Sequence, residues 1–191
     1  MISNSPGKLV VISGPSGAGK TTVLREVFQR ASAPLVASIS ATTRQPRPGE
    51  QNGLDYHFLA PEEFARRRDS GAFLECCEVY GRGDWYGTLK GEVAPRLAAG
   101  KWVVLEIDVH GTLAVLEHYP DAVTIFLRPS SMAELERRLR ERGTETEDAL
   151  RRRLAVAAEE LKSIERYRYQ VINDDVELAV AELCRILTPD S

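Results

Sequence analysis

The chain of 191 residues is long enough for one domain with its own hydrophobic core. Its formal net charge of −3 and isoelectric point near 5.7 give no reason to expect a nucleic-acid partner or an anionic membrane surface. No apolar run approaches the roughly 18 residues of a membrane helix, and the polar start lacks a signal-peptide pattern. We therefore expect a cytoplasmic protein that does not bind membranes and whose partners are small molecules.

The cysteines and histidines indicate neither a disulfide framework nor a metal knuckle. Two of the three cysteines are adjacent, at Cys76 and Cys77, and we expect reduced thiols packed in or beside a strand. The three histidines lack the spacing of zinc ligands. The sequence contains no internal repeat, and it does not indicate an oligomeric state.

The stretch from Gly14 to Thr21 reads Gly-Pro-Ser-Gly-Ala-Gly-Lys-Thr, which matches the phosphate-cradling pattern G-x-x-x-x-G-K-[ST]. An apolar run over residues 8–13 predicts a buried strand before it. Apolar residues at helical spacing after it predict a helix that begins near Lys20. This strand, loop and helix context favours a true phosphate loop over a glycine turn without a ligand.

The residue types of this loop suit a polyphosphate. Gly14, Gly17 and Gly19 allow backbone conformations that point successive N–H groups inward, and the helix N-terminus adds partial positive charge. Lys20 is predicted to reach the β and γ phosphates, and the Thr21 hydroxyl to bind Mg²⁺.

Residues 35–40 predict a second strand, and residues 41–53, with two prolines and two glycines, predict a loop. This loop carries Arg44 and Arg47, whose guanidinium groups suit an anionic ligand. From composition alone, an ordinary solvated surface loop explains the stretch equally well.

The segment Ser-Ile-Ser-Ala-Thr-Thr-Arg-Gln-Pro-Arg over 38–47, followed by Gly49-Glu50, Gly53 and Asp55-Tyr56, resembles the signature of the guanylate kinase family. The resemblance extends over about residues 8–187. It implies an α/β fold, a P-loop NTPase core whose parallel sheet is flanked by helices, with a small inserted α+β nucleotide-binding lobe and a helical lid. The whole chain, 1–191, would be one such domain, with its core at about 1–38 and 90–191, the lid at about 137–155 and the GMP-binding lobe at about 39–89.

The resemblance also implies an activity, the transfer of a phosphoryl group from ATP to GMP, and to dGMP, with Mg²⁺. It assigns the phosphate of GMP to side chains with hydroxyl and guanidinium donors, which suit a nearly dianionic group. These are Ser40, Arg44, Arg47 and Tyr56, together with Tyr86 from the element Trp85-Tyr86-Gly87-Thr88, while Glu50 is expected to orient the arginines.

We next expect a short strand over 55–59, a helix over 61–70 and an alternating strand over 73–80 that places Phe73, Glu75, Cys77 and Val79 on one face. A carboxylate among apolar neighbours is costly without donors. The resemblance assigns Glu75 to the N1–H and amino group of guanine and the Thr88 hydroxyl to its O6. The stretch from Glu75 to Tyr86 is about two residues longer than is usual in the family, and Cys76-Cys77 replaces its common Trp-Ala.

The second half of the chain predicts a helix over 90–99, in which Pro95 marks a break or the start, and an apolar strand over 102–108. This strand ends in Asp108, which the resemblance places near the acceptor nucleotide and the metal, and His110 replaces a usual glutamine. A strand over 123–127 precedes two helices, opened by capping boxes at Ser131 and Thr144, and a strand over 171–175 precedes a last helix over 176–187.

The resemblance completes three sets of site residues. Arg142 and Arg153 would be lid arginines that join Lys20, Arg44 and Arg47 in catalysis, and Asn173 would approach the adenine of ATP. The ATP-binding set is Gly14, Pro15, Ser16, Gly17, Ala18, Gly19, Lys20, Thr21, Thr22 and Asn173. The GMP-binding set is Ser40, Arg44, Arg47, Glu50, Tyr56, Glu75, Tyr86, Thr88 and Asp108.

Two other functions fit parts of this pattern. A guanylate kinase-like module that binds without catalysis would be expected to lose the phosphate loop, and the intact Gly19-Lys20-Thr21 disfavours it. A P-loop kinase for another phosphate acceptor, such as ribose 1,5-bisphosphate, would keep Lys20 but would not use Glu75 and Thr88 as guanine readers.

Overall fold

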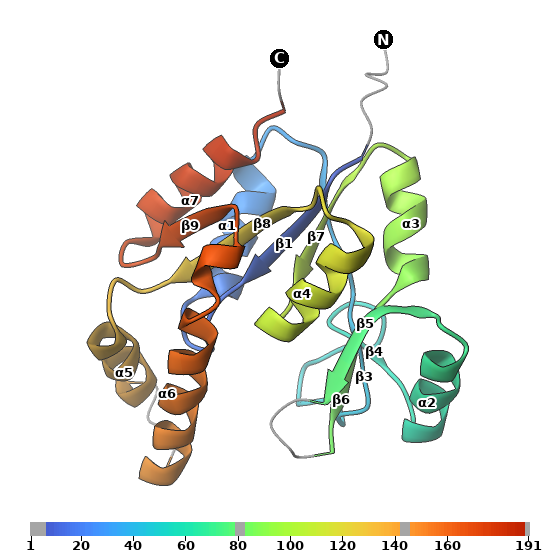
Figure 1. Cartoon of the computed structure of the whole chain (residues 1–191), viewed down its shortest axis with the longest axis horizontal. Coiled ribbons are helices and arrows are strands. Elements are labelled where there is room, and N and C mark those ends of the chain that lie inside the picture. Colours follow the sequence, from blue (N-terminus) through green and yellow to red (C-terminus); the bar gives the residue numbers. More distant parts are fainter. Residues whose placement is uncertain (1–6, 79–82, 142–145, 190–191) are drawn as a thin grey trace. The chain divides into compact units, whose positions relative to one another are not determined.

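The computed structural model describes residues 7–78, 83–141 and 146–189 (Figure 1). Its contacts divide the chain into two compact units. Unit 1 comprises Met1–Leu9, Val36–Leu105 and His110–Ala122, and unit 2 comprises Val10–Leu35, Glu106–Val109 and Val123–Ser191. None of the helices in the described ranges has the length and apolar character that crossing a membrane requires.

The strands form two sheets. A five-stranded sheet has the order β2-β7-β1-β8-β9, and a four-stranded sheet has the order β4-β3-β6-β5. In the larger sheet β1 pairs with β8 and β8 with β9, and both pairs are parallel. Parallel strands covered on both faces are apolar throughout, and all five residues of β1 (Leu9–Ser13) are buried. The predicted α/β fold class is confirmed.

Unit 2 carries the strand and helix that flank the phosphate loop. Its last helix begins at a cap, because the Asp175 side chain accepts a hydrogen bond from the Leu178 N–H. The elements of unit 2 after β1 are α1 (Lys20–Arg30), β8 (Val123–Arg128), α5 (Met132–Glu141), α6 (Glu147–Leu161), the short 3₁₀ helix η1 (Ile164–Arg166), β9 (Tyr169–Ile172) and α7 (Val176–Ile186).

Helices α5 and α6 lie side by side and share a small core (Figure 1). Leu135 and Leu139 from α5 pack with Leu150 and Ala157 from α6, and all four are buried. The Ser131 hydroxyl accepts a hydrogen bond from the Glu134 N–H, as the predicted first capping box requires.

Unit 1 contains the smaller sheet, whose apolar side packs on α2 through Phe64, Phe73 and Ala41. In this sheet β3 pairs parallel with β4 and antiparallel with β6, and β5 pairs antiparallel with β6. The elements from β2 onward are β2 (Leu35–Ala37), β3 (Ala41–Thr42), β4 (His57–Phe58), α2 (Pro61–Asp69), β5 (Phe73–Glu78), β6 (Trp85–Leu89), α3 (Lys90–Ala98), β7 (Trp102–Glu106) and α4 (Val109–His118).

Three predicted elements need correction in the first half of the chain. The strand predicted over 35–40 ends at Ala37, and the stretch predicted as a loop over 41–53 begins with β3. Ala41 and Thr42 are extended because they pair with β6 and β4, which a local pattern does not reveal. The strand predicted over 73–80 contains a bulge between Phe73 and Glu75, so that Leu74 is buried too and the simple alternation is wrong there. Val79 lies outside the described residues.

Three more differences concern helices. Helix α4 was not predicted at all. Pro95 lies inside α3 rather than at its break or start. Helix α6 is capped by Thr146, whose hydroxyl accepts the Ala149 N–H at 3.3 Å, whereas the predicted cap, Thr144, lies outside the described residues.

Candidate functional site

The phosphate loop has the backbone that its glycines predict. Gly14, Gly17 and Gly19 have φ angles of 137°, 96° and 87°, in the region that favours glycine. A Cβ atom at Gly14 would lie 1.9 Å from the Leu127 carbonyl oxygen, so no side chain fits there. At Gly17 a Cβ would lie 2.8 Å from Leu139 Cδ2, which shows that the loop rests on α5. The loop is therefore a built feature of the fold and not a solvated turn.

Lys20 is half-buried and directed back over this loop. Its Nζ donates hydrogen bonds to the carbonyl oxygens of Gly14 at 2.6 Å and of Pro15 at 3.2 Å. Burial lowers the pKa of Lys20, while the nearby carboxylates of Glu106, Glu160 and Asp108 act in the opposite direction. Carbonyl oxygens are only weakly negative partners for the Lys20 ammonium group, and the phosphate oxygens of a polyphosphate would be much stronger ones.

Thr21 contacts a carboxylate that sequence reasoning did not select. Its hydroxyl donates to Glu106, with Oγ1 3.1 Å from Oε1 and 3.4 Å from Oε2. Glu106 is the last residue of β7, and Asp108, the predicted residue, follows two positions later. Asp108 lies in the same unit, close enough to influence the pKa of Lys20. The signal that could have identified Glu106 is its position at the end of a buried strand.

The donor atoms beside Thr21 suit magnesium. Hydroxyl and carboxylate oxygens are hard ligands, and Mg²⁺ in nucleotide sites uses one or two protein groups together with substrate phosphates. No cluster of three or more His, Cys, Asp or Glu that could hold a metal by itself occurs in the described ranges. Thr21 and Glu106 therefore fit a metal that arrives with a nucleotide rather than one held by the protein alone.

Glu160 on α6 is a second carboxylate that sequence reasoning missed. Burial raises its pKa to about 7, with Lys20 opposing the shift and Asp108 adding to it. Its Oε2 is buried and has no hydrogen-bond partner among the described residues. In the sequence, Glu160 is one of two adjacent glutamates, and this pattern gives no sign of burial.

Asn173 lies at the end of β9, where its side chain is 2% exposed. Its Nδ2 donates to the Ala18 carbonyl oxygen of the phosphate loop at 2.7 Å. The expected approach of Asn173 to adenine stays a prediction.

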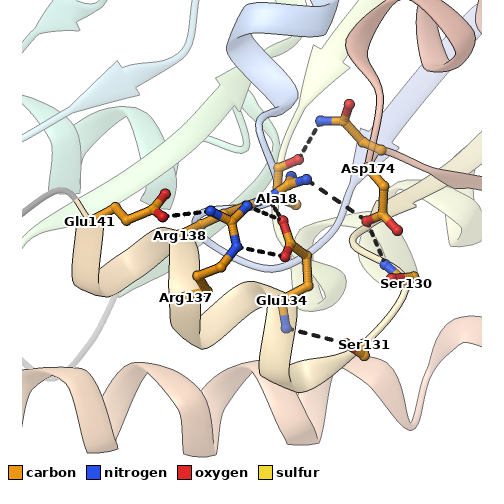
Figure 2. Close-up of polar contacts among 9 residues, drawn as sticks. Ala18, Ser130, Ser131, Glu134, Arg137, Arg138, Glu141 and Asp174 are labelled. Atoms are coloured by element: carbon orange, nitrogen blue, oxygen red, sulfur yellow. Dashed lines mark hydrogen bonds and ion pairs between the residues drawn. The ribbon is translucent and has the colours of Figure 1, made fainter.

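Asp174, the next residue, connects to the helix that supports the loop. Its Oδ1 accepts the Ser130 N–H at 2.9 Å, and Nη2 of Arg138 on α5 lies 3.8 Å from the same oxygen (Figure 2). Arg138 is also held by Glu134 of the same helix at 2.6 Å. The hydrogen bond from Ser130 lowers the pKa of Asp174. The end of β9 is therefore tied to α5 by charged groups.

In unit 1, Arg44 is the centre of a polar cluster. Its guanidinium donates to both oxygens of Glu50, at 3.0 and 2.9 Å, and to the Gln45 carbonyl oxygen at 2.7 Å. Its Nε donates to the Tyr86 hydroxyl at 3.1 Å. The hydrogen bonds that Arg44 donates to Glu50 raise the pKa of Arg44 further above its ordinary value. Glu50 thus contacts Arg44 with both carboxylate oxygens, and its role in orienting Arg44 for a ligand stays a prediction.

Of the remaining predicted phosphate ligands, Tyr56 and Arg47 contact this cluster. The Tyr56 ring lies under Arg44, with the guanidinium carbon 5.4 Å from the ring centroid, and stands edge-on to the Tyr86 ring. The Arg47 N–H donates to Glu50 at 2.7 Å, and Arg47 itself is exposed. The Ser40 carbonyl oxygen accepts the His57 N–H.

Glu75 and Thr88 face each other on β5 and β6. Their positions are paired in the sheet, and the Thr88 hydroxyl donates to Glu75 Oε1 at 2.7 Å. Glu75 is 8% exposed and Thr88 is fully buried. A buried carboxylate beside a hydroxyl is what a ligand with adjacent N–H and carbonyl groups can pair with.

The other predicted site residues have simpler surroundings. Pro15, Ser16 and Ala18 lie in the loop between β1 and α1, and Thr22 lies in the first turn of α1. Arg153 lies on α6 and is half-buried. Arg142 lies outside the described residues, as does the part of the longer loop that falls in 79–82.

The site residues thus form two groups. The phosphate loop, Asp108, Arg153 and Asn173 belong to unit 2, and the predicted GMP ligands from Ser40 to Thr88 belong to unit 1. Cys76, Cys77 and Cys184, which all lie in the described ranges, are thiols and not disulfides.

Comparison with known proteins identifies the family of the chain. The sequence profile of the guanylate kinase family matches residues 6–190. The chain is 58% identical over 184 residues to a guanylate kinase of Rhodopirellula baltica, covering 95% of this chain and 88% of the relative. It is 48% identical over 188 residues to a guanylate kinase of Caldanaerobacter subterraneus, covering 94% and 90% respectively. The crystal structure of guanylate kinase from Anaplasma phagocytophilum has a TM-score of 0.75 at 33% identity, covering 96% of this chain and 85% of that one. This chain belongs to the guanylate kinase family.

Proposed function

We propose that the protein is an ATP:GMP phosphotransferase, which makes ADP and GDP and also accepts dGMP. The observation that carries this proposal is the arrangement on β6. Tyr86 belongs to the polar cluster around Arg44, and Thr88 is the partner of Glu75. The two residues are two positions apart on the strand, so their side chains share one face. Along a strand they are roughly 7 Å apart, which suits the separation of a phosphate from its base.

The acceptor needs no general base. A phosphate oxygen of GMP is already anionic, so it attacks the γ-phosphorus of ATP directly, and the bond from that phosphorus to the β–γ bridging oxygen breaks. The work of the protein is to position both groups and to stabilise charge. In this proposal Lys20 binds the β and γ phosphates, and Arg44, Arg47, Arg142 and Arg153 stabilise the transferred group.

Mg²⁺ is the expected cofactor. Thr21 would hold it, with Glu106 as the neighbouring carboxylate, and Asp108 remains a predicted further ligand. Bound there, the ion would neutralise charge on the β and γ phosphates. In the structure the Thr21 hydroxyl donates its proton to Glu106 and keeps its lone pairs, so it could bind a cation without losing this hydrogen bond.

The choice of base follows from hydrogen-bond satisfaction. Guanine offers N1–H and an amino group to the Glu75 carboxylate, whereas adenine has no N1–H and would leave a buried acceptor unpaired. Thr88 now donates its single proton to Glu75, and rotation of the hydroxyl would let it donate to guanine O6. A mismatch of this kind can reject a base by roughly 10⁴-fold.

Several expectations remain part of this proposal. The expected partners are GMP, dGMP and ATP, with no nucleic acid or membrane. The protein is expected to act in the cytoplasm, and the core, the lobe and the lid are expected to have the boundaries given above. The family match disfavours both alternatives, a kinase for ribose 1,5-bisphosphate and a module without catalysis.

Chromatographic analysis of the products tests the reaction. With MgATP and GMP, the wild type should produce ADP and GDP in equal amounts. The Lys20→Ala variant should lose about 10³-fold in turnover and still bind GMP. Lys101→Ala, which removes an exposed lysine outside the loop, should keep the wild-type rate. Formation of ADP without GDP would indicate hydrolysis and contradict the proposal.

A further inference from the structure

The carboxamide of Asn173 contacts the backbone of the phosphate loop. Its Nδ2 donates to the Ala18 carbonyl oxygen at 2.7 Å, and the residue is 2% exposed. Ala18 itself is fully buried. A hydrogen bond between two such groups is shielded from water, so it is stronger and more directional than a surface contact.

The structure fixes which way this amide faces. The backbone N–H of Asn173 donates to the Arg128 carbonyl oxygen at 2.8 Å, which anchors the residue to the end of β8. Its Oδ1 is buried and has no partner in the part of the chain that the structure describes. If the amide were reversed, two oxygen atoms would oppose each other at Ala18, so the donating orientation is the stable one.

The position of the amide also explains why residue 19 is glycine. A Cβ atom at Gly19 would lie 2.6 Å from Asn173 Nδ2, and the φ of Gly19 is 87°. The amide therefore occupies the space that a side chain at position 19 would need.

The peptide that Asn173 contacts is one that can rotate. It joins Ala18 to Gly19, and a peptide followed by glycine can reverse at little steric cost. In a planar trans peptide the C=O and N–H groups point in opposite directions. A carbonyl held toward Asn173 therefore directs the Gly19 N–H away from it.

We propose that Asn173 is a positioning residue for phosphate binding: through the Ala18 carbonyl it holds the Ala18–Gly19 peptide so that the Gly19 N–H faces the polyphosphate. This inference rests on the proposed function for the identity of the ligand, ATP. It differs from the expected contact with adenine, because it acts on the phosphates and not on the base. Asn173 would act through the loop and is not a catalytic residue.

Binding of magnesium tripolyphosphate, which has no base or ribose, tests the proposal. Calorimetry should show that Asn173→Leu weakens its affinity by about tenfold, the effect of one hydrogen bond of ordinary strength. The KM for MgATP should rise by a similar factor, and the KM for GMP should stay within about twofold of the wild type.

Thr124→Val is the matched control. Thr124 is 3% exposed, and its hydroxyl accepts the Arg168 N–H at 2.9 Å, so this variant also loses one buried side-chain to backbone hydrogen bond in unit 2. It should lower the melting temperature without weakening tripolyphosphate binding. Should Asn173→Leu fail to fold, Asn173→Ser replaces it, because the shorter hydroxyl cannot reach Ala18.

Unchanged tripolyphosphate affinity in a folded Asn173 variant would overturn the proposal, and weaker binding of MgATP alone would assign Asn173 to the base instead. Equal weakening by Thr124→Val would also overturn it, because the effect would then be general destabilisation. Loss of tripolyphosphate binding in the Asn173 variant with no GMP turnover in the wild type would support the positioning role and contradict only the proposed function.

Discussion

In the proposed reaction, the choice of acceptor depends on Glu75. Replacing its carboxylate in Glu75→Gln presents an amide N–H₂ to one of the two guanine donors. We expect kcat/KM for GMP to fall about 10- to 100-fold, as for the loss of a hydrogen bond to a charged group, with the KM for MgATP unchanged. Steady-state kinetics with each substrate varied in turn will measure this.

Glu78 provides the control on the same strand. It is exposed, and it accepts the Gly83 N–H at 2.9 Å, so Glu78→Gln removes the same charge outside the buried pair. That variant should keep the wild-type kcat/KM for GMP. If Glu75→Gln raised the KM for MgATP instead, the assignment of the base pocket would be wrong.

Glu160 makes stability depend on pH. Burial raises its pKa to about 7, above the ordinary value of 4.5, so the folded protein holds a proton there that the unfolded chain has released. The free energy of unfolding therefore falls as pH rises from about 4.5 to 7. The Glu160→Gln variant has no group that ionises at this position, so its free energy of unfolding should exceed that of the wild type by about 2 kcal/mol at pH 8.

Denaturant unfolding of both proteins at pH 5 and pH 8 measures this effect. The two proteins should differ little at pH 5, and the variant should be the more stable at pH 8. The charged groups that act on Glu160 are Lys20, which favours its ionised form, and Asp108, which opposes it. A stability difference that is the same at both pH values would show that Glu160 does not titrate in this range.

At the residue scale, the sequence identified groups whose roles follow from a fixed local pattern. The three loop glycines have the predicted backbone because the pattern itself requires positive φ. The partner of Thr21 was not identified, because Glu106 and Asp108 are both acids near one strand end and only packing decides between them. Glu160 was missed because its burial depends on how α6 packs in unit 2, which helical spacing does not reveal.

At the element scale, a test at the start of α6 distinguishes between two candidate N-cap residues, Thr146 and Thr144. Thr146→Ala should lower the free energy of unfolding by about 1 kcal/mol, because the Ala149 N–H loses its acceptor. Thr144→Ala, which alters the cap that the sequence pattern favoured, should have a much smaller effect. Denaturant melts of the two variants measure the difference, and a larger loss for Thr144→Ala would place the cap at the earlier residue.

The elements that sequence patterns predicted are those that a local signal defines. Strand β1 is an unbroken apolar run, and α7 begins at an aspartate cap. Strand β3 has two residues in a stretch rich in proline and glycine, and only its pairing with β4 and β6 makes it a strand. Helix α4 contains Gly111, and because glycine is a poor helix former, helix propensity did not indicate this helix.

At the scale of the whole molecule, a protein of net charge −3 binds anions through local arrangement and not through its overall charge. Many arginines on α5 are neutralised by glutamates of the same helix, for example Arg137 by Glu134 and Glu141. These exposed pairs contribute little to stability. In the proposed function, anions bind instead at the phosphate loop and at the Arg44 cluster. The sequence identified both places because each carries a motif.

The most direct test of the central claim is a coupled ADP-release assay with saturating MgATP and a panel of acceptors. The panel comprises GMP, dGMP, AMP, CMP, UMP and ribose 1,5-bisphosphate, and kcat/KM is measured for each. We predict turnover confined to GMP and dGMP, with AMP lower by roughly 10⁴-fold. Comparable turnover of AMP or of ribose 1,5-bisphosphate, or no turnover of GMP by folded protein that binds ATP, would contradict the account.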